Sequence, residues 1–404
     1  MKKNNLLPVV ATAVFGMIIL TITNGLTFSG LTVFDEALIE QFSWTKSELK
    51  FRDFINLAAA AVIMPFMGAI IDRFGTKVCI IFGLLLLAAG FTAYSYIGSS
   101  THMYLIHLLF AFAVSTAGVL AVIIMVQERV SQNRGLAIGI ALAGTSTGSL
   151  FMSKLGGVLL ESFGWRQAFR YEALLPLGLA VIVFLILKNT DKVREDGTKK
   201  TDDLVEITFA DALKTKQFWM LSFVGFFCYY SIMAAMGNLF LYMRELDFSS
   251  DTAINALGLI SMLILGAKFL SGALTDYINK FQLFKIQIFI MMIGGLLFGL
   301  YSRDLVWYAI PIFALGWGGL YTLINFIIIT TFGVNAAGKI GGTISFFESL
   351  GAGLGIWLSG LIADQTGSYA MSFQVITGFL LAALIISLLI NPVDKDASTQ
   401  SSLD

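Results

Sequence analysis

The sequence is poor in charge and in the residues that build disulfides and metal sites. Only 13% of its 404 residues are Asp, Glu, Lys or Arg, and it contains two cysteines and two histidines. Cys79 and Cys228 lie inside apolar runs, which argues against a disulfide framework or a thiolate metal site. Lys and Arg balance Asp and Glu at 26 each, so no nucleic-acid partner is expected. We expect neither a metal nor a cofactor.

Apolar residues dominate the chain instead. They make up 57% of it, and the mean hydropathy is +0.82, which is too apolar for an ordinary soluble protein. Stretches of membrane-crossing length, about 20 residues, cover residues 7–33, 47–71, 78–97, 102–126, 135–160, 167–187, 217–243, 253–278, 284–302, 305–330, 340–363 and 370–390. They lack the alternation of barrel strands. We therefore predict an all-α membrane protein with twelve transmembrane helices in the lipid bilayer.

A polar segment near the middle divides the chain in two. We predict a six-helix half over residues 1–188, a cytoplasmic linker over 189–216, a second six-helix half over 217–391 and a cytoplasmic tail over 392–404. Between the spans, Lys and Arg concentrate on the side of the chain termini. This asymmetry predicts that both termini face the cytoplasm, in a plasma membrane or a bacterial inner membrane.

A short motif occurs once in each half. Gly68 and Asp72 lie between spans 2 and 3 with three residues separating them, and Gly272 and Asp276 repeat this spacing between spans 8 and 9. The two copies are about half the chain length apart. This spacing indicates a duplicated six-helix unit.

The first copy continues into a longer loop motif. With Gly68, the run Asp72-Arg73-Phe74-Gly75-Thr76-Lys77 resembles the G-x-x-x-D-R-x-G-x-[RK] loop of the major facilitator superfamily. The resemblance implies a monomer whose two halves rock about a central cavity. It also implies a loop that stabilises one end state of this conformational switch without touching substrate. The residues of the predicted switch loop are Gly68, Asp72, Arg73, Gly75, Lys77, Gly272 and Asp276.

Four further segments carry a narrower resemblance. Residues 32–34, 42–47, 164–169 and 363–369 are similar to segments of the monocarboxylate transporter and oxalate/formate antiporter branch. They fall at the predicted outer ends of spans, where we expect them to serve as scaffold.

Two ionisable residues lie within the predicted spans, where a charge is expensive unless it faces a cavity or a partner. Lys268 stands in span 8, where the monocarboxylate branch commonly has an Arg that binds the substrate carboxylate. The resemblance implies that Lys268 binds the substrate. The alternative is a structural Lys that is permanently paired with an acid.

Glu348 lies in span 11, at about the position where oxalate-exchanging members have a Lys. A carboxyl opposite Lys268 suggests a proton site, because protonation of Glu348 would free Lys268 for an anion. A static Lys268–Glu348 ion pair, or a Glu that binds a cationic or polar substrate, are the competing interpretations. Many monocarboxylate transporters have a Lys late in span 1, but Ser29 stands there in this sequence.

Other polar residues within the spans are candidates for the cavity wall, although each of them can equally serve as a helix-to-helix hydrogen bond. They are Asn24, Ser29, Asn56, Tyr229, Tyr230, Asn238, Tyr321 and Asn325. We expect Lys154 to point outward, toward Glu172. The charged side chains at the start of span 2, Lys50, Arg52 and Asp53, are expected to line a vestibule or to meet water.

These observations predict a secondary active transporter that moves a small organic anion, with a monocarboxylate as the expected substrate, by alternating access coupled to protons. No spacing typical of a Ser-His-Asp or paired-carboxylate centre is present, which argues against an enzyme. One rival hypothesis is a facilitator or efflux carrier for a neutral or cationic solute, in which Lys268 and Glu348 satisfy each other. The other is a transporter-like sensor that binds its ligand without translocation.

Overall fold

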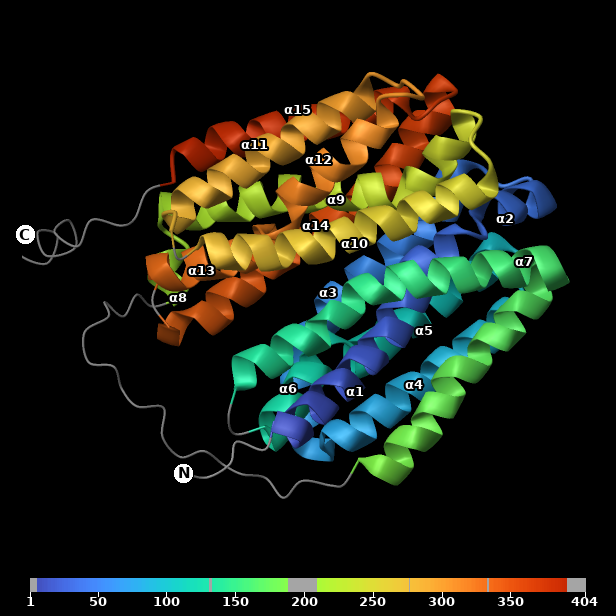
Figure 1. The fold of residues 1–404 in the computed structure, drawn as a ribbon, viewed down its shortest axis with the longest axis horizontal. Coiled ribbons are helices and arrows are strands. Elements are labelled where there is room, and N and C mark those ends of the chain that lie inside the picture. Colours follow the sequence, from blue (N-terminus) through green and yellow to red (C-terminus); the bar gives the residue numbers. More distant parts are fainter. Residues whose placement is uncertain (1–5, 131–132, 188–208, 276, 333, 391–404) are drawn as a thin grey trace, which may run out of the picture.

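A computed structural model describes residues 6–130, 133–187, 209–275, 277–332 and 334–390 (Figure 1). Within these ranges all regular elements are helical. The first half contains α1 (Leu6–Gly25), its π-helical continuation η1 (Leu26–Gly30), α2 (Asp35–Phe42), α3 (Lys46–Phe74), α4 (Thr76–Tyr94), α5 (Ser100–Ala117), α6 (Val119–Arg129) and α7 (Arg134–Ile186). The second half contains α8 (Phe209–Ala212), α9 (Lys216–Glu245), α10 (Ser250–Leu274), α11 (Lys280–Gly299), α12 (Val306–Gly318), α13 (Leu320–Phe332), α14 (Val334–Thr366) and α15 (Ala370–Leu388).

The predicted twelve spans are confirmed, although some are built from more than one element. Ten stretches are long and apolar enough to cross a bilayer, and they include α7 as a single helix of 53 residues. Such a helix would be about 80 Å long, far more than a bilayer is thick. Gly164 interrupts it with a φ of 72°, so α7 forms two spans. The short apolar helices α12 and α13 together supply the remaining span.

Local sequence signals determine where several spans begin. Thr45, Ser99, Thr215 and Ser249 precede α3, α5, α9 and α10, and each side chain accepts a hydrogen bond from a backbone N–H of the first turn. These caps satisfy donors that a helix leaves unpaired at its start. Thr45 and Glu48 complete a reciprocal capping box on α3.

The two halves form separate bundles that lie side by side, with the first half blue to green and the second half yellow to red (Figure 1). We call the two ends of the molecule the α2 end, where α2 lies, and the α8 end, where α8 lies. α7 runs beside α10, and α3 runs beside α14. Of the predicted linker, the described part contains α8, whereas the predicted tail over residues 392–404 lies outside the described residues.

Candidate functional site

Lys268 lies on α10 at the interface between the halves. It stands 18 residues after Ser250, about 27 Å along the helix from the α2 end. Its ammonium donates to the hydroxyl oxygens of Thr145 (3.2 Å) and Ser146 (3.4 Å) on α7 of the first half. Among the described residues, no carboxylate forms an ion pair with Lys268. The cation is therefore held by neutral groups.

Glu348 lies on α14 at a similar depth, 18 residues before Thr366, and is buried with 6% exposure. It packs against α9 at Gly225, where a Cβ atom would stand 3.1 Å from Glu348 Cγ. In this conformation it makes no ion pair with Lys268. The Lys268 ammonium contacts the first half, and the Glu348 carboxyl packs within the second.

The predicted wall residues fall into separate groups. Ser29 donates to Ser149 (2.8 Å) and lines a cavity between the halves. Tyr230 stacks edge-on against Phe379 of α15, inside the second half. Asn238 accepts a hydrogen bond from the Tyr369 hydroxyl (3.0 Å), also inside that half.

The remaining candidates lie on α1, α3, α9 and α13. Asn24 donates to Thr23 at 3.4 Å on α1, and Asn56 is buried on α3. Tyr229 is half-buried on α9. The side chains of Tyr321 and Asn325, on α13, lie outside the part of the chain that the structure describes.

The predicted switch loop joins α3 to α4 at the α8 end. Gly75 adopts a φ of 84°, which favours glycine, and so allows α4 to start directly after α3 ends. Thr76 donates to Glu128 at the end of α6 (2.6 Å), and Lys77 lies over the Phe184 ring. The loop is thus tied to neighbouring helices of its own half.

The other loop residues are placed as follows. Gly68, Asp72 and Arg73 lie on the last turns of α3, and Gly272 lies near the end of α10. Asp276 lies outside the described residues. A Cβ atom on Gly68 or Gly272 would meet nothing within 4 Å, so neither glycine is in a tight contact in this conformation.

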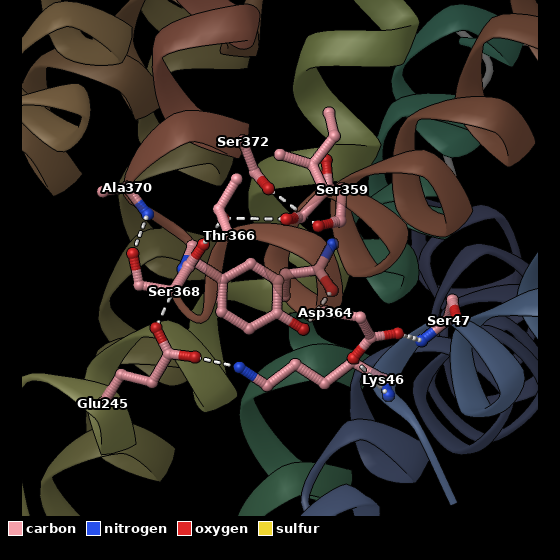
Figure 2. Close-up of polar contacts among 12 residues, drawn as sticks. Lys46, Ser47, Glu245, Ser359, Asp364, Thr366, Ser368, Ala370 and Ser372 are labelled. Carbon is pink, nitrogen blue, oxygen red and sulfur yellow. Dashed lines mark hydrogen bonds and ion pairs between the residues drawn. The ribbon is translucent and has the colours of Figure 1, made fainter.

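At the α2 end, the two halves are joined by polar contacts (Figure 2). The carboxylate of Asp364 on α14 accepts from the backbone N–H groups of Lys46 (2.9 Å) and Ser47 (2.7 Å) at the start of α3. The Lys46 ammonium forms an ion pair with Glu245 of α9. We call the group of Lys46, Ser47, Glu245 and Asp364 the α2-end gate.

The local sequence explains this arrangement. The first turn of α3 leaves N–H groups free and carries a partial positive charge, which suits a carboxylate. Arg244, beside Glu245, makes a second bridge to Glu36 of α2 at 2.8 Å. The segments 42–47 and 363–369, predicted to be scaffold, therefore contact each other across the halves.

A buried cluster of charges lies next to the gate. Asp35 on α2 accepts from both Lys50 and Arg52 of α3, and all three side chains are fully buried. Lys50 also donates to the backbone oxygen of Gly237 in the second half. Arg52 also donates a hydrogen bond to the Tyr94 hydroxyl (3.2 Å).

Two expectations about charged residues are wrong in part, although Asp53 lines a cavity and Lys154 is exposed as expected. Lys50 and Arg52 do not meet water, because Asp35 lies close enough to pair with both of them. Lys154 is exposed and does not pair with Glu172, which is buried with both oxygens lacking a hydrogen-bond partner among the described residues. The sequence did contain one sign of this burial, because Lys50, Arg52 and Asp53 lie close together near the start of an apolar helix. Charged residues in such a helix usually have a partner.

Comparisons with known proteins identify the family. The model of the Major Facilitator Superfamily matches residues 17–356, so the chain belongs to this superfamily of transporters. It is 24% identical over 382 residues to the oxalate:formate antiporter of Oxalobacter formigenes, covering 88% of this chain and 89% of that protein. It is 27% identical over 341 residues to monocarboxylate transporter 13 of Bos taurus, covering 81% and 76%. These relatives confirm the predicted resemblance to the monocarboxylate transporter and oxalate/formate antiporter branch.

A solved structure shows the same fold. A crystal structure of a bacterial homologue of the human lysosomal transporter Spinster, in an inward-facing and occupied conformation, superposes with a TM-score of 0.74. The identity is 15%, and the match covers 94% of this chain and 95% of that one. With the family match and the transporter relatives, the chain is an integral membrane transporter of small molecules rather than an enzyme.

Proposed function

We propose that the protein is a secondary active transporter of a small organic anion, with a monocarboxylate as the expected substrate, coupled to protons. Lys268 would bind the substrate carboxylate. The observation that supports this role is that its ammonium lies between the halves, hydrogen-bonded to two neutral hydroxyls and to no acid among the described residues. Such a cation can take an anion without first breaking an ion pair.

Glu348 would carry the coupling proton. It is buried at about the depth of Lys268, where an ionised carboxyl is expensive and a neutral one is not. A transporter in which Lys268 and Glu348 satisfy each other is the rival for a neutral or cationic solute. The separation of the two side chains in this conformation supports the anion transporter instead.

The α2-end gate supports alternating access. It closes one end of the interface between the halves with ion pairs and hydrogen bonds that can break and re-form as the halves rock. We propose that substrate enters or leaves at the α8 end in this conformation, and that the termini are cytoplasmic.

Uptake into proteoliposomes tests the assignment, with a panel of radiolabelled small carboxylates and an imposed inward proton gradient. We expect wild-type protein to accumulate one of these acids. Lys268→Ala should lower its uptake about 10- to 100-fold, because hydrogen bonds to charged groups contribute about 1.5 to 3 kcal/mol. Glu348→Gln should retain exchange of substrate but lose accumulation driven by the gradient.

Lys154→Ala is the matched control, because Lys154 is an exposed lysine on α7. It should transport like wild type. If correctly inserted wild-type protein takes up no carboxylate, the anion assignment is overturned. If it binds a carboxylate without translocation, the protein is a sensor.

A further inference from the structure

A small cavity lies between the halves, close to the α2-end gate and far from Lys268. Its volume is about 30 Å³, enough for about two water molecules. Asp53 on α3 lies on its wall, 7 residues after Lys46 and therefore about 10 Å from the α2 end. Its lining residues are Phe28, Ser29, Thr32, Asp53, Met233, Met236, Gly237 and Ile356.

Asp53 is the poorly satisfied acid beside the buried cluster. Its Oδ2 atom is buried and has no hydrogen-bond partner among the described residues. Its Oδ1 atom is 3.6 Å from Arg52 Nε, which is too long for a direct hydrogen bond. Arg52 and Lys50 both form their short ion pairs with Asp35 instead.

The charged groups near Asp53 come from the first half, whereas the residues that the second half adds to the cavity wall are uncharged. The charged and titratable groups near Asp53 are Arg52 and Lys50 on α3, Asp35 on α2 and Tyr94 on α4, whose hydroxyl lies 3.4 Å from His107 of α5. Arg52 attracts the ionised form of Asp53. From the second half, α9 and α14 contribute only methionine, glycine and isoleucine to the cavity. Closure of the α2 end therefore covers Asp53 Oδ2 with groups that cannot donate to it.

The cavity suits a proton better than a metal cation. Metal cations such as sodium need several oxygen ligands, but the cavity wall offers two hydroxyls beside the carboxylate. Neither hydroxyl donates to Asp53, because Ser29 donates to Ser149 and Thr32 donates to the Ser29 backbone oxygen. A proton on Asp53 Oδ2 neutralises a buried carboxylate oxygen that has no donor among the described residues, and it supplies a donor for water in the cavity.

We propose that Asp53 is a second proton-binding site, which takes up a proton from water on the α2 side as the α2-end gate closes and releases it when the gate opens. The inference rests on the proposed proton coupling but concerns a different step. Glu348 acts beside the substrate, whereas Asp53 links proton uptake to closure of the gate. Because the closed state binds the extra proton, low pH favours closure and high pH favours opening.

Distances between two spin labels, measured by pulsed electron paramagnetic resonance without substrate, test the proposal. The labels are placed at Glu40→Cys on α2 and Asp251→Cys on α10, both exposed at the α2 end of opposite halves. In the otherwise wild-type protein, the ratio of closed to open populations should rise by up to about tenfold per unit fall in pH. With Asp53→Asn, the ratio should stay near its low-pH value, with less than about twofold change per pH unit.

Glu161→Gln, which neutralises an exposed acid on α7, is the control and should keep the pH dependence. An unchanged pH dependence in a monodisperse Asp53→Asn protein would overturn the inference.

Infrared difference spectra of wild type between the two pH limits give a second measurement that needs no fold-perturbing variant. They should contain a protonated-carboxyl band at low pH that disappears in Asp53→Asn, and absence of any such band in wild type contradicts the proposal. Failure of carboxylate uptake leaves both measurements interpretable, so the two proposals fail separately.

Discussion

Glu348 lies against a stretch of bare backbone, and this contact limits the room available to its carboxyl group. The residue opposite it on α9 is Gly225, and a Cβ atom there would be 3.1 Å from Glu348 Cγ and 3.5 Å from Oε1. A larger residue must displace either the carboxyl or the helix. Glycine at this position therefore matters for packing, not for backbone conformation.

We predict that Gly225→Ala lowers the free energy of unfolding by about 1 to 3 kcal/mol, the usual effect of overpacking. Thermal unfolding in detergent measures it. Gly178→Ala is the control, because a Cβ atom at Gly178 on α7 meets nothing within 4 Å. This second change should leave stability unaltered or raise it, since alanine is the better helix former. Equal melting temperatures for the two variants would contradict the packing argument.

At the scale of elements, the start of α3 is where the halves are joined. The Lys46–Glu245 and Arg244–Glu36 pairs are partly exposed and contribute on the order of 1 kcal/mol each, so neither closes the α2 end alone. Asp364 adds charge-assisted hydrogen bonds to two backbone donors. Closure is the sum of several weak contacts, which keeps it reversible.

We predict that Lys46→Glu shifts the gate toward opening, because it places two carboxylates side by side. The closed-to-open ratio, measured with the same label pair at constant pH, should fall about 3- to 30-fold, as loss of one pair and like-charge repulsion imply. Adding Glu245→Lys restores an opposite-charge pair and should recover most of the ratio. Failure of the double exchange to recover it would mean that the ion pair does not hold the gate.

Sequence alone predicted the elements better than the contacts between them. The spans were recognisable because a bilayer requires long apolar helices, and Lys268 and Glu348 were recognisable because charge inside a span is expensive. The pairing of Asp35 with Lys50 was missed because it depends on the chain reversal after α2, where Ser43 adopts a φ of 55°. No local pattern joins residue 46 to residue 364, since the arrangement of the two halves creates that contact.

At the scale of the whole molecule, the structure is closed at the α2 end, as the gate contacts show. A transporter that alternates must also break these contacts in every cycle. The gate residues Lys46 and Glu245 belong to opposite halves, α3 and α9. A link between them should therefore hold the protein in one state without touching Lys268 or Glu348.

We predict that a cleavable bifunctional thiol reagent abolishes transport by the Lys46→Cys/Glu245→Cys variant, and that cleavage restores it. The native cysteines, Cys79 and Cys228, are both buried, so the introduced pair should react selectively. Uptake in proteoliposomes before and after reductant measures the effect. Each single-cysteine variant, treated with the same reagent, should retain its uptake, because one attachment leaves the halves free to rock. Undiminished uptake by fully cross-linked protein would show that this end of the molecule need not open during transport.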